Sequence, residues 1–430
     1  MSRATVLVVD SGGRGDALVY KYSQSLKVGK VLAIPGNDLM QFNSKKVKTI
    51  PRVGVTDILG ILKICKKYKV DLIDVGPEEA IEAGVVDHLE KVGFAVVGPT
   101  RISSQIEWDK AWARGFMRKY KLPIPKFFVF HNQKEGVKFL KNTKNRAWFV
   151  KANGLLGGKG ALPARDSKEA KQRISELEKF GRAGETYLLE EWLVGEEFSA
   201  FAICDGKDFK IVGSAQDYKR MFNFDEGENT GGMGSSSPVS VVNAKIRPQI
   251  SKIFKTTFDG LAREGRQYKG VLYLGGIIVK GKVFVIEFNA RWGDPEAEVL
   301  IPSIRTDFYD VGRAIALGGV AKLKVKQDKL VRVAVCGASR PGVNTRGLRV
   351  FGLERARNAP GVKIFGKRVN KKGGKYYADQ GRLFFVMGEG KSVSEARESA
   401  YQAMAMISIE GNNLHYRTDI GYRDVERVRG

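Results

Sequence analysis

The stretch VFVIEFNARWGDPEAE at 283–298 restricts the possible folds of this chain more than any other part of the sequence. It begins as a β-strand, in which successive side chains point to opposite faces. One face is wholly apolar and is expected to enter a core: Phe284, Ile286 and Phe288. The other face ends in two polar groups and consists of Val283, Val285, Glu287 and Asn289. The strand therefore predicts a polar site that lies directly against a packed core.

Glu287 and Asn289 place a carboxylate and an amide oxygen on one face, about 7 Å apart along the strand. Two hard oxygen ligands at this spacing can hold one Mg²⁺ (or Mn²⁺), with water and phosphate oxygens as the remaining ligands. Arg291, Gly293 and Asp294 follow in a charged turn that can approach a second anionic group. The alternative is an edge strand with a solvated polar end, and the strand by itself does not decide between the two.

The composition describes a globular protein with an excess of positive charge. The 430 residues are enough for two to four domains at ~100–200 residues each. Lysine and arginine outnumber aspartate and glutamate by 73 to 47, a net charge of +26, so a polyanionic partner such as nucleic acid must be considered. The basic residues are spread along the chain, however, and no RNA-binding motif is present. We therefore expect a basic surface without a nucleic-acid partner.

The rare residue types exclude several kinds of chemistry. The three histidines are isolated, so general-base catalysis by histidine is not expected. The three cysteines are also isolated and no CxxC occurs, so neither a disulfide framework nor a zinc site is indicated. No apolar run approaches the ~18 residues of a membrane helix, and the N-terminus lacks the apolar core of a signal peptide. We therefore expect a cytoplasmic monomer or homodimer without a membrane segment.

The first part of the chain, residues 1–102, has the pattern of an α/β domain. Strands alternate with helices up to about residue 100, which predicts an open parallel sheet whose loops gather at the carboxyl ends of the strands. The first strand is followed by the turn SGGRG at 11–15, whose backbone N–H groups can face an anion. The turn does not match GxGxxG, so a dinucleotide site is not indicated.

The second part, residues 103–322, begins with a helix over 104–120. The capping box formed by Ser104 and Glu107 marks its start. Lys110 lies off the apolar stripe of this helix and is therefore either solvated or directed at a ligand. We expect the helix to run without interruption to the prolines that follow it.

A glycine-rich flap, KANGLLGGKG at 151–160, is entered from a predicted strand at 147–150. Its glycines between two lysines allow backbone N–H groups to close over phosphates, although a plain flexible turn is the alternative. The flap is not a Walker A loop, because no GK[ST] opens a helix here. Glu190 and Glu197 flank an apolar strand and suit an adenine slot with a carboxylate for the ribose, with surface acids as the alternative. The polar loop at 228–235 is expected to contact a ligand.

The last part, residues 323–430, changes to short strands with one clear helix at 392–407. Ser392 and Glu395 form a capping box at the start of this helix. No chemistry-bearing motif is present, which predicts a small α+β domain.

Taken in order, these motifs resemble the ATP-grasp enzymes, and in particular the phosphoribosylamine–glycine ligase (glycinamide ribonucleotide synthetase) family. The most specific motifs are KANGLLGGKG (151–160), SAQDYKR (214–220), ENTGGMGSSSP (228–238) and VIEFNARWGDPE (285–296). The resemblance extends over nearly the whole chain through GPEEAIEAGVVD (76–87), VGPT (97–100) and YRTDIGYRD (416–424). It implies an N-terminal open parallel sheet, a central ATP-grasp region with a mobile lid at about 124–192, and a small C-terminal α+β domain.

The resemblance also implies a reaction of purine biosynthesis. ATP, glycine and 5-phosphoribosylamine give glycinamide ribonucleotide, ADP and phosphate through a glycyl phosphate intermediate, with Mg²⁺ or Mn²⁺ as the metal. The implied ATP-binding residues are Lys110, Lys151, Gly157, Gly158, Lys159, Glu190, Leu193 and Glu197. The implied substrate-facing residues are Gly13, Glu78, Asp217, Lys219, Arg220, Asn229, Arg291, Gly293 and Asp294. Catalytic roles are implied for Lys159, Asp217 and Arg291, and metal ligation for Glu287 and Asn289.

Several positions depart from the motifs of this family. The first loop, usually GSGGREHA, here has Gly15 and Asp16 in place of Glu and His. The helix motif, usually Ser-Lys-Ala-Phe, begins with Asp109, and Asn153 replaces an acidic residue in the flap. After Gly-Pro-Glu at 76–78, Ala-Ile stands where Pro-Leu is common. These changes bear on the amine acceptor rather than on the use of ATP.

Two alternatives to this function follow from the same sequence. The first is another ATP-grasp carboxylate–amine ligase with a related substrate, suggested by the altered loop at 14–16. The second is a basic protein that keeps the fold but binds nucleic acid, whose affinity would fall steeply with salt. The intact pair Glu287 and Asn289 and the flap argue against the second alternative.

Overall fold

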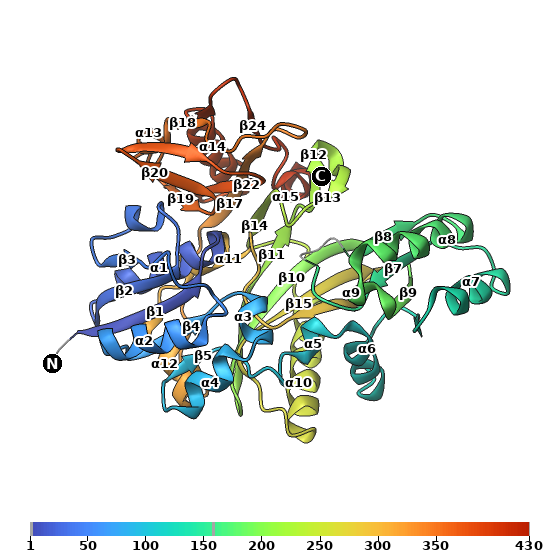
Figure 1. The fold of residues 1–430 in the computed structure, drawn as a ribbon. Coiled ribbons are helices and arrows are strands. Elements are labelled where there is room, and N and C mark those ends of the chain that lie inside the picture. The colour runs from blue at the N-terminus through green and yellow to red at the C-terminus, as the bar shows by residue number, and fades with distance from the viewer. Residues whose placement is uncertain (1–2, 157–159, 430) are drawn as a thin grey trace.

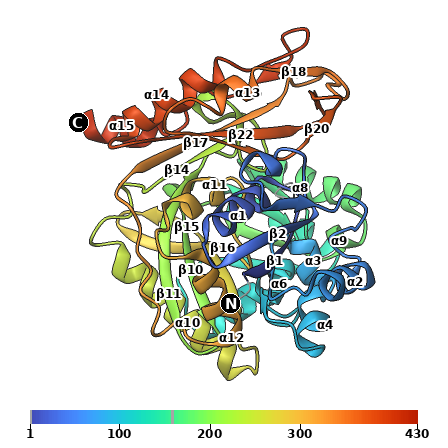
Figure 2. The same cartoon turned by 90° about the vertical axis from the view of Figure 1, so that its left-hand side faces the viewer.

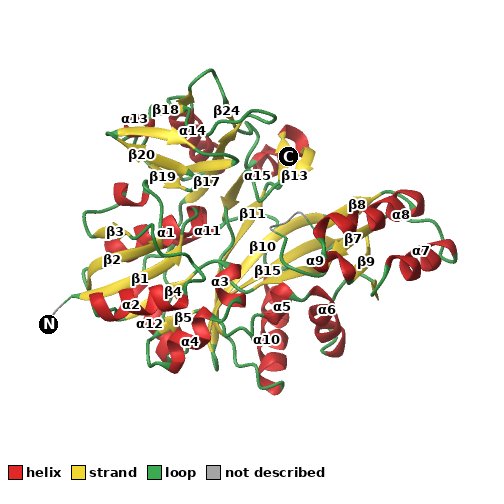
Figure 3. Cartoon of the chain, viewed as in Figure 1, coloured by secondary structure: helices red, strands yellow, loops and turns green. Residues whose placement is uncertain are grey.

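The computed structural model describes residues 3–156 and 160–429 and builds them mainly on four β-sheets (Figures 1 and 3). The first is a five-stranded sheet with the order β3-β2-β1-β4-β5, and all its neighbouring strands are parallel. Its elements are β1 (Ala4–Asp10), α1 (Gly13–Gln24), β2 (Val28–Pro35), β3 (Val47–Thr49), α2 (Ile58–Tyr68), β4 (Leu72–Val75), α3 (Glu78–Glu82), α4 (Val85–Lys91) and β5 (Val96–Val97). The predicted open parallel sheet is confirmed.

A nine-stranded sheet forms the centre of the molecule and continues into the C-terminal part. Its path is β16-β15-β10-β11-β14-β17-β22-β19, and β24 pairs with β17. The elements of residues 103–322 outside the lid are α5 (Gln105–Trp108), α6 (Lys110–Lys119), β10 (Glu196–Asp205), β11 (Phe209–Asp217), the ribbon β12 (Arg220–Phe222) and β13 (Glu226–Asn229), β14 (Gly234–Ser237), α10 (Arg247–Arg263), β15 (Lys269–Val279), β16 (Lys282–Asn289), α11 (Ala297–Leu300) and α12 (Phe308–Leu317). The proposed boundary near residue 322 falls between α12 and β17, while the sheet itself runs on.

The lid is a separate antiparallel sheet that projects from the central sheet (Figure 1). Its strand order is β6-β9-β7-β8, and helices pack on one of its faces. Its elements are β6 (Phe127–Phe130), α7 (Gln133–Lys141), β7 (Trp148–Ala152), β8 (Ala161–Ala164), α8 (Ser167–Ser175), α9 (Arg182–Glu185) and β9 (Tyr187–Glu191). The glycine-rich flap joins β7 to β8 at the edge of this sheet.

The C-terminal part combines the last strands of the central sheet with a small antiparallel sheet of order β20-β21-β18-β23. Its elements are β17 (Val331–Ser339), β18 (Arg349–Phe351), α13 (Leu353–Ala356), β19 (Val362–Gly366), β20 (Val369–Lys372), β21 (Lys375–Ala378), β22 (Arg382–Gly390), α14 (Val393–Met404), β23 (Ser408–Ile409), β24 (Leu414–His415) and α15 (Tyr422–Arg429). In the turned view of Figure 2 this part lies above α1 and the N-terminal sheet. None of the helices in the described ranges is both long and apolar enough to cross a membrane.

The N-terminal sheet and the C-terminal part are joined through Gly366, at the end of β19. Asp16 Oδ2 accepts a hydrogen bond of 2.6 Å from the Gly366 N–H, and Asn37 Nδ2 donates one of 2.8 Å to the Gly366 carbonyl. Asp16 is fully buried and also contacts the Asn43 side-chain amide. Both backbone polar groups of Gly366 are therefore satisfied by side chains from the N-terminal part.

The strand β16 differs from its predicted alternation in one respect. Gly275 pairs with Glu287 but Gly276 pairs with Val285, so Ile286 is an extra residue that forms a β-bulge. The bulge reverses the alternation: Val283 and Val285 face the same core as Phe288, whereas Ile286, Glu287 and Asn289 line a pocket. The prediction that Phe284 and Ile286 enter the core is therefore wrong. The prediction that Glu287 and Asn289 share a face is confirmed.

Arg114, on α6, holds the bulge in place. Its guanidinium donates to the carbonyls of Val285 and Ile286 at 3.1 and 2.6 Å. It also makes two hydrogen bonds, of 2.6 and 2.8 Å, to the carboxylate of Glu190 on β9. Because Arg114 is only 2% exposed, these contacts exclude water and link α6, the lid and β16.

The predicted single helix over 104–120 is wrong, because the structure divides it into α5 and α6 at Asp109. The backbone of Asp109 is extended, with φ −120° and ψ 91°, and its side chain accepts a hydrogen bond from the Trp112 N–H. Asp109 therefore acts as the N-cap of a new helix. Ser104 makes no side-chain cap, and Glu107 instead accepts the Ala290 N–H.

We predict that Arg114→Met lowers the free energy of unfolding by about 3–5 kcal/mol, the range for breaking a buried ion pair. Lys151 alone cannot replace the donors that Arg114 gives to Glu190 and to the two bulge carbonyls. Urea denaturation measures the loss. Arg118→Met, on an exposed position of the same helix, is the matched control and should change stability by no more than about 0.5 kcal/mol. Equal losses in the two variants would contradict the proposed role.

We predict a pH-dependent effect of Asp16→Asn. Burial raises the pKa of Asp16 from its ordinary value of 3.8 to about 8, although the Gly366 N–H and Asn43 lower it. Between these values the folded protein holds a proton that the unfolded chain has released, so stability falls as the pH rises. Asparagine mimics the neutral carboxyl, so the variant should gain stability relative to the wild type from pH 5 to pH 8.

Urea denaturation at a series of pH values tests this effect. The exposed Asp259, replaced by asparagine, controls for the loss of one carboxylate. A difference between Asp16→Asn and wild type that stays constant from pH 5 to pH 8 would contradict the expectation.

Candidate active site

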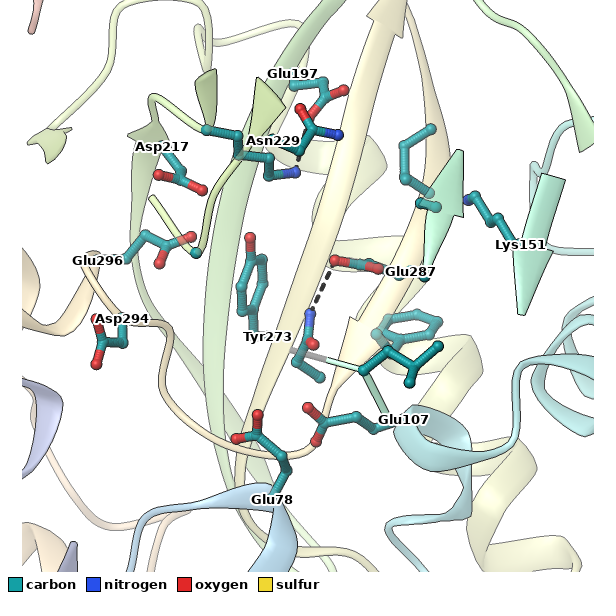
Figure 4. A pocket seen from close by; sticks show the side chains of 18 of the residues that line it. Glu78, Glu107, Lys151, Glu197, Asp217, Asn229, Tyr273, Glu287, Asp294 and Glu296 are labelled. Carbon is teal, nitrogen blue, oxygen red and sulfur yellow. Dashed lines mark hydrogen bonds and ion pairs between the residues drawn. The ribbon is translucent and has the colours of Figure 1, made fainter. Parts of the chain in front are cut away.

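One large pocket of about 910 Å³ opens where the N-terminal sheet, the lid, the central sheet and the C-terminal part meet. Figure 4 shows labelled side chains from the N-terminal part (Glu78), the lid (Lys151) and the central part gathered around Glu287. Nearly every residue that the sequence assigns to the site lines this pocket: Glu78, Lys110, Lys151, Glu190, Leu193, Glu197, Asp217, Lys219, Arg220, Asn229, Glu287, Asn289, Arg291 and Asp294. Gly157, Gly158 and Lys159 lie outside the described residues.

Glu287 and Asn289 lie side by side on the pocket face of β16. Asn289 Nδ2 is 3.4 Å from Glu287 Oε1, and Asn289 Oδ1 is 3.3 Å from an Arg291 guanidinium nitrogen. Burial by itself raises the pKa of Glu287, but Lys219, Lys151 and Lys110 outweigh this and lower it. The carboxylate therefore stays ionised in a positively charged environment.

The side-chain oxygens of Glu287 and Asn289 are suitable ligands for a hard divalent cation. A carboxylate and an amide oxygen are suitable ligands for Mg²⁺, which normally keeps waters and substrate phosphates as its other ligands. Within the described ranges, no group of three or more histidine, cysteine, aspartate or glutamate residues could hold a metal ion without such help. The protein therefore provides only part of the coordination shell among the described residues, and a bound phosphate would provide further ligands.

On the lid side, Lys110 and Lys151 lie next to the first residues of the flap. Lys151 Nζ is 2.6 Å from Glu190 Oε2, inside the same cluster as Arg114. Burial by itself raises the pKa of Glu190, but Arg114 and Lys151 outweigh it and bring the pKa down to about 2. Lys110 Nζ donates to the carbonyl of Gly154 at 2.8 Å, and burial lowers its pKa. Lys110 is thus directed into the site, and the alternative of a solvated side chain is excluded.

Next to the N-terminal sheet, two arginines and two carboxylates form a network. Arg291 lies 3.2 Å from Glu78 and 3.1 Å from Glu107, and Arg14 lies 3.7 Å from Glu78. Arg291 lowers the pKa of Glu78 to about 2, aided by Arg14 and opposed by burial. Burial raises the pKa of Glu107 to about 7. The network leaves two guanidinium groups at the pocket wall.

Asp217, at the end of β11, lies on the same side of the pocket as the carboxylate of Glu296. Burial and then Glu296 raise its pKa well above the usual range, although Lys219 opposes them. Its Oδ1 atom has no hydrogen-bond partner among the residues that the structure describes. Lys219 itself is 2.9 Å from Glu197. Figure 4 shows Asp217 and Glu296 on the opposite side of Glu287 from Lys151.

The C-terminal part contributes cations that the sequence analysis missed. Lys367 and Arg382 lie 2.6 and 2.8 Å from the two carboxylate oxygens of Asp294. They outweigh burial and hold the pKa of Asp294 below its usual range. Arg368 and Arg423 also line the pocket. The sequence shows no chemistry-bearing motif in this part, because isolated basic residues in short strands form no recognisable motif.

Two predicted substrate contacts lie behind the pocket wall. A Cβ at Gly13 would lie 2.2 Å from Glu298 Oε1, and a Cβ at Gly293 would lie 2.1 Å from Glu296 Oε2. Neither glycine lines the pocket, so their small size serves close packing. Gly15 and Asp16 of the altered first loop are also absent from the lining, whereas Ser11, Gly12 and Arg14 belong to it.

Comparisons with known proteins agree along the whole chain. Family models of phosphoribosylglycinamide synthetase match with the N domain at residues 4–107, the ATP-grasp (A) domain at 108–297 and the C domain at 330–423. The phosphoribosylamine–glycine ligase of Caldanaerobacter subterraneus subsp. tengcongensis is 37% identical, over 96% of this chain and 99% of that protein. That of Caulobacter vibrioides is 35% identical, over 99% and 100%.

A solved structure agrees with the sequence matches. The crystal structure of phosphoribosylamine–glycine ligase from Thermotoga maritima matches with a TM-score of 0.82 and 29% identity, over 97% of this chain and 100% of that one. The matches cover the three parts whose side chains meet in the pocket. This chain therefore belongs to the phosphoribosylglycinamide synthetase family of ATP-dependent ligases.

Proposed function

We propose that this chain joins glycine to 5-phosphoribosylamine at the described pocket, with ATP as the energy source and Mg²⁺ or Mn²⁺ as the metal. The observation that carries the proposal is the convergence of lysines and arginines from four parts of the fold on Glu287 and Asn289 in one pocket. Three anionic groups, the triphosphate, the glycine carboxylate and the phosphate of the amine, need such a set of cations.

The lid side of the pocket suits ATP. Lys110 and Lys151 provide positive charge next to the flap, and Leu193 and Ile286 provide apolar surface for a purine ring. Glu197 can accept hydrogen bonds from the ribose hydroxyls once Lys219 turns to an anionic substrate. The contribution of Glu190 differs from the one implied by the family resemblance, because its carboxylate is already engaged by Arg114 and Lys151. We propose that Glu190 positions Lys151 rather than contacting the adenine.

The metal belongs between the two ends of the pocket, at Glu287 and Asn289. When bound, Mg²⁺ or Mn²⁺ neutralises charge on the triphosphate and orients it. Arg291 lies next to Asn289 and can hold the glycine carboxylate in line with the terminal phosphate. The protein's contribution to this step is positioning and charge neutralisation, since none of its three histidines lines the pocket.

The amine end of the pocket suits phosphoribosylamine. In the second step the amine nitrogen forms a bond to the acyl carbon of glycyl phosphate, the bond from carbon to the phosphate oxygen breaks, and the nitrogen loses one proton. Asp217 and Glu296 are the neighbouring carboxyl groups at this end, and whichever of the two is ionised can accept this proton. Arg14 and Lys219 are the cations available for the phosphate of the amine.

The altered first loop does not favour a different acceptor. Asp16 lies outside the pocket and binds Gly366, and a Cβ at Gly15 would lie 2.6 Å from the Asp10 side chain. This packing supports the leading proposal over the related ligase that the altered loop suggests. Phosphate release from ATP with Mg²⁺, glycine and freshly prepared phosphoribosylamine, each omitted in turn, tests the function. Release that needs glycine but not phosphoribosylamine would point to another amine.

We predict that Glu287→Gln lowers the rate of ligation about 100-fold or more, because it removes the charged member of the metal pair. The Mg²⁺ concentration needed for half-maximal rate should rise in the same variant. Steady-state kinetics at increasing Mg²⁺ measures both effects. Glu226→Gln removes a carboxylate from an exposed position outside the pocket and serves as control. A variant at position 287 with wild-type Mg²⁺ dependence would exclude the metal assignment.

We predict that Asp217→Asn lowers kcat by about 10²- to 10⁴-fold, the usual contribution of a group that accepts a proton. ATP affinity should stay near the wild-type value, because Asp217 lies at the amine end. Kinetics with saturating glycine and amine, together with calorimetric titration of ATP, separates the two quantities. Asp208→Asn, at an exposed turn, is the control. A loss confined to ATP affinity would place Asp217 in nucleotide binding instead.

A further inference from the structure

The first residues of the flap are fastened to the start of α6 by one side chain. Asn153 Oδ1 accepts a hydrogen bond of 2.7 Å from the Ala111 N–H, and Asn153 Nδ2 donates one of 3.2 Å to Asp109 Oδ1. The same Asp109 oxygen accepts the Trp112 N–H at 3.0 Å. Asn153 and Asp109 therefore share the capping of α6, each satisfying one of the N–H groups that a helix start leaves unpaired.

The backbone of Asn153 belongs to the lid. Its N–H lies 3.1 Å from the carbonyl oxygens of both Ala183, in α9, and Thr186, which precedes β9. Among the described residues, the hydrogen bonds of its side chain go to Ala111 of α6 and to Asp109, the N-cap of that helix. Asn153 thus joins the end of β7, from which the flap begins, to the start of α6.

The position of Lys110 depends on this contact. Lys110 Nζ donates to the carbonyl oxygens of Gly154 at 2.8 Å and Asn153 at 3.4 Å, and Lys110 is the first residue of α6. A shift of Asn153 away from α6 would take both acceptors from the ammonium group. Because Lys110 and Lys151 flank the same part of the pocket, such a shift would also change the spacing of the two cations.

We propose that Asn153 and Asp109 form a tether that positions Lys110 and the flap for ATP. The tether requires one partner that donates and one that accepts, and the amide of Asn153 and the carboxylate of Asp109 fulfil this condition. An aspartate at position 153 would place two carboxylates in contact and replace the hydrogen bond by repulsion. The inference rests on the use of ATP by this family and not on the identity of the amine.

A double-mutant cycle tests the tether. Asn153→Asp should weaken ATP binding by about tenfold, as expected for two partly buried like charges in contact. In the background Asp109→Ser the same change should have little effect, because a serine hydroxyl can cap Trp112 and also donate to the new carboxylate. ATP affinity is measured by calorimetry without glycine and amine, so a different acceptor would not affect the result.

Two further readings distinguish a tether from a general loss of structure. The defect of Asn153→Asp should shrink as the pH falls toward 5, because one of two adjacent carboxylates then takes up a proton. Asn142→Asp adds the same charge to an exposed position of the lid and should leave ATP affinity and its pH dependence unchanged. Thermal unfolding of each variant shows that it is folded.

Rescue by Asp109→Ser together with the pH dependence supports the tether. Equal effects of Asn153→Asp with Asp109 and with Ser at position 109 would overturn it. If Asn153→Asp does not fold, Asn153→Ala takes its place: its effect on ATP affinity should be smaller when Asp109 is already serine, and equal effects would again overturn the proposal.

Discussion

The buried ion pair of Arg114 and Glu190, with its hydrogen bonds to the bulge in β16, is the interaction on which the active site depends. Without an extra residue at Ile286, the alternation of β16 would direct Glu287 and Asn289 into the same core as Val283 and Val285. The bulge exposes two carbonyls that need donors away from water, and Arg114 supplies both. One arginine thereby fixes which face of β16 carries Glu287 and Asn289, and it also fixes the place of the lid strand β9, which carries Glu190.

The lysines of the pocket likewise need counter-charges, which explains why many carboxylates lie in a pocket that is rich in cations. Lys151 is paired with Glu190, Lys219 with Glu197, and Lys367 with Asp294. A cation held away from water without a counter-charge is strongly destabilised. The carboxylates keep these cations in place, and the substrate phosphates can add to or replace the pairs without creating an isolated charge. Specificity for anionic substrates thus coexists with a folded, charge-balanced site.

Much of this arrangement follows from sequence patterns, and the exceptions have physical causes. The parallel sheet, the lid, the flap and the pair Glu287 and Asn289 come from periodicity and from motifs of neighbouring residues. The bulge at Ile286 and the helix break at Asp109 depend on partners distant in sequence, Arg114 and Asn153, which periodicity cannot indicate. Lys367 and Arg382 reach Asp294 only because β19 and β22 pack against the N-terminal part. No local pattern marks them as site residues.

The polar motif at 228–238 connects the site to this packing. Asn229 lines the pocket, yet Gly234–Ser237 form β14, the strand that joins the ATP-grasp strands to β17 of the C-terminal part. A Cβ at Gly234 would lie 2.5 Å from the Ala334 carbonyl oxygen, and the φ of 155° there is unfavourable for other residues. The motif therefore contributes both to the lining of the pocket and to the continuity of the sheet. Because the sheet is continuous, Lys367 and Arg382 are held at fixed positions relative to Glu287, and the C-terminal part is structurally inseparable from the active site.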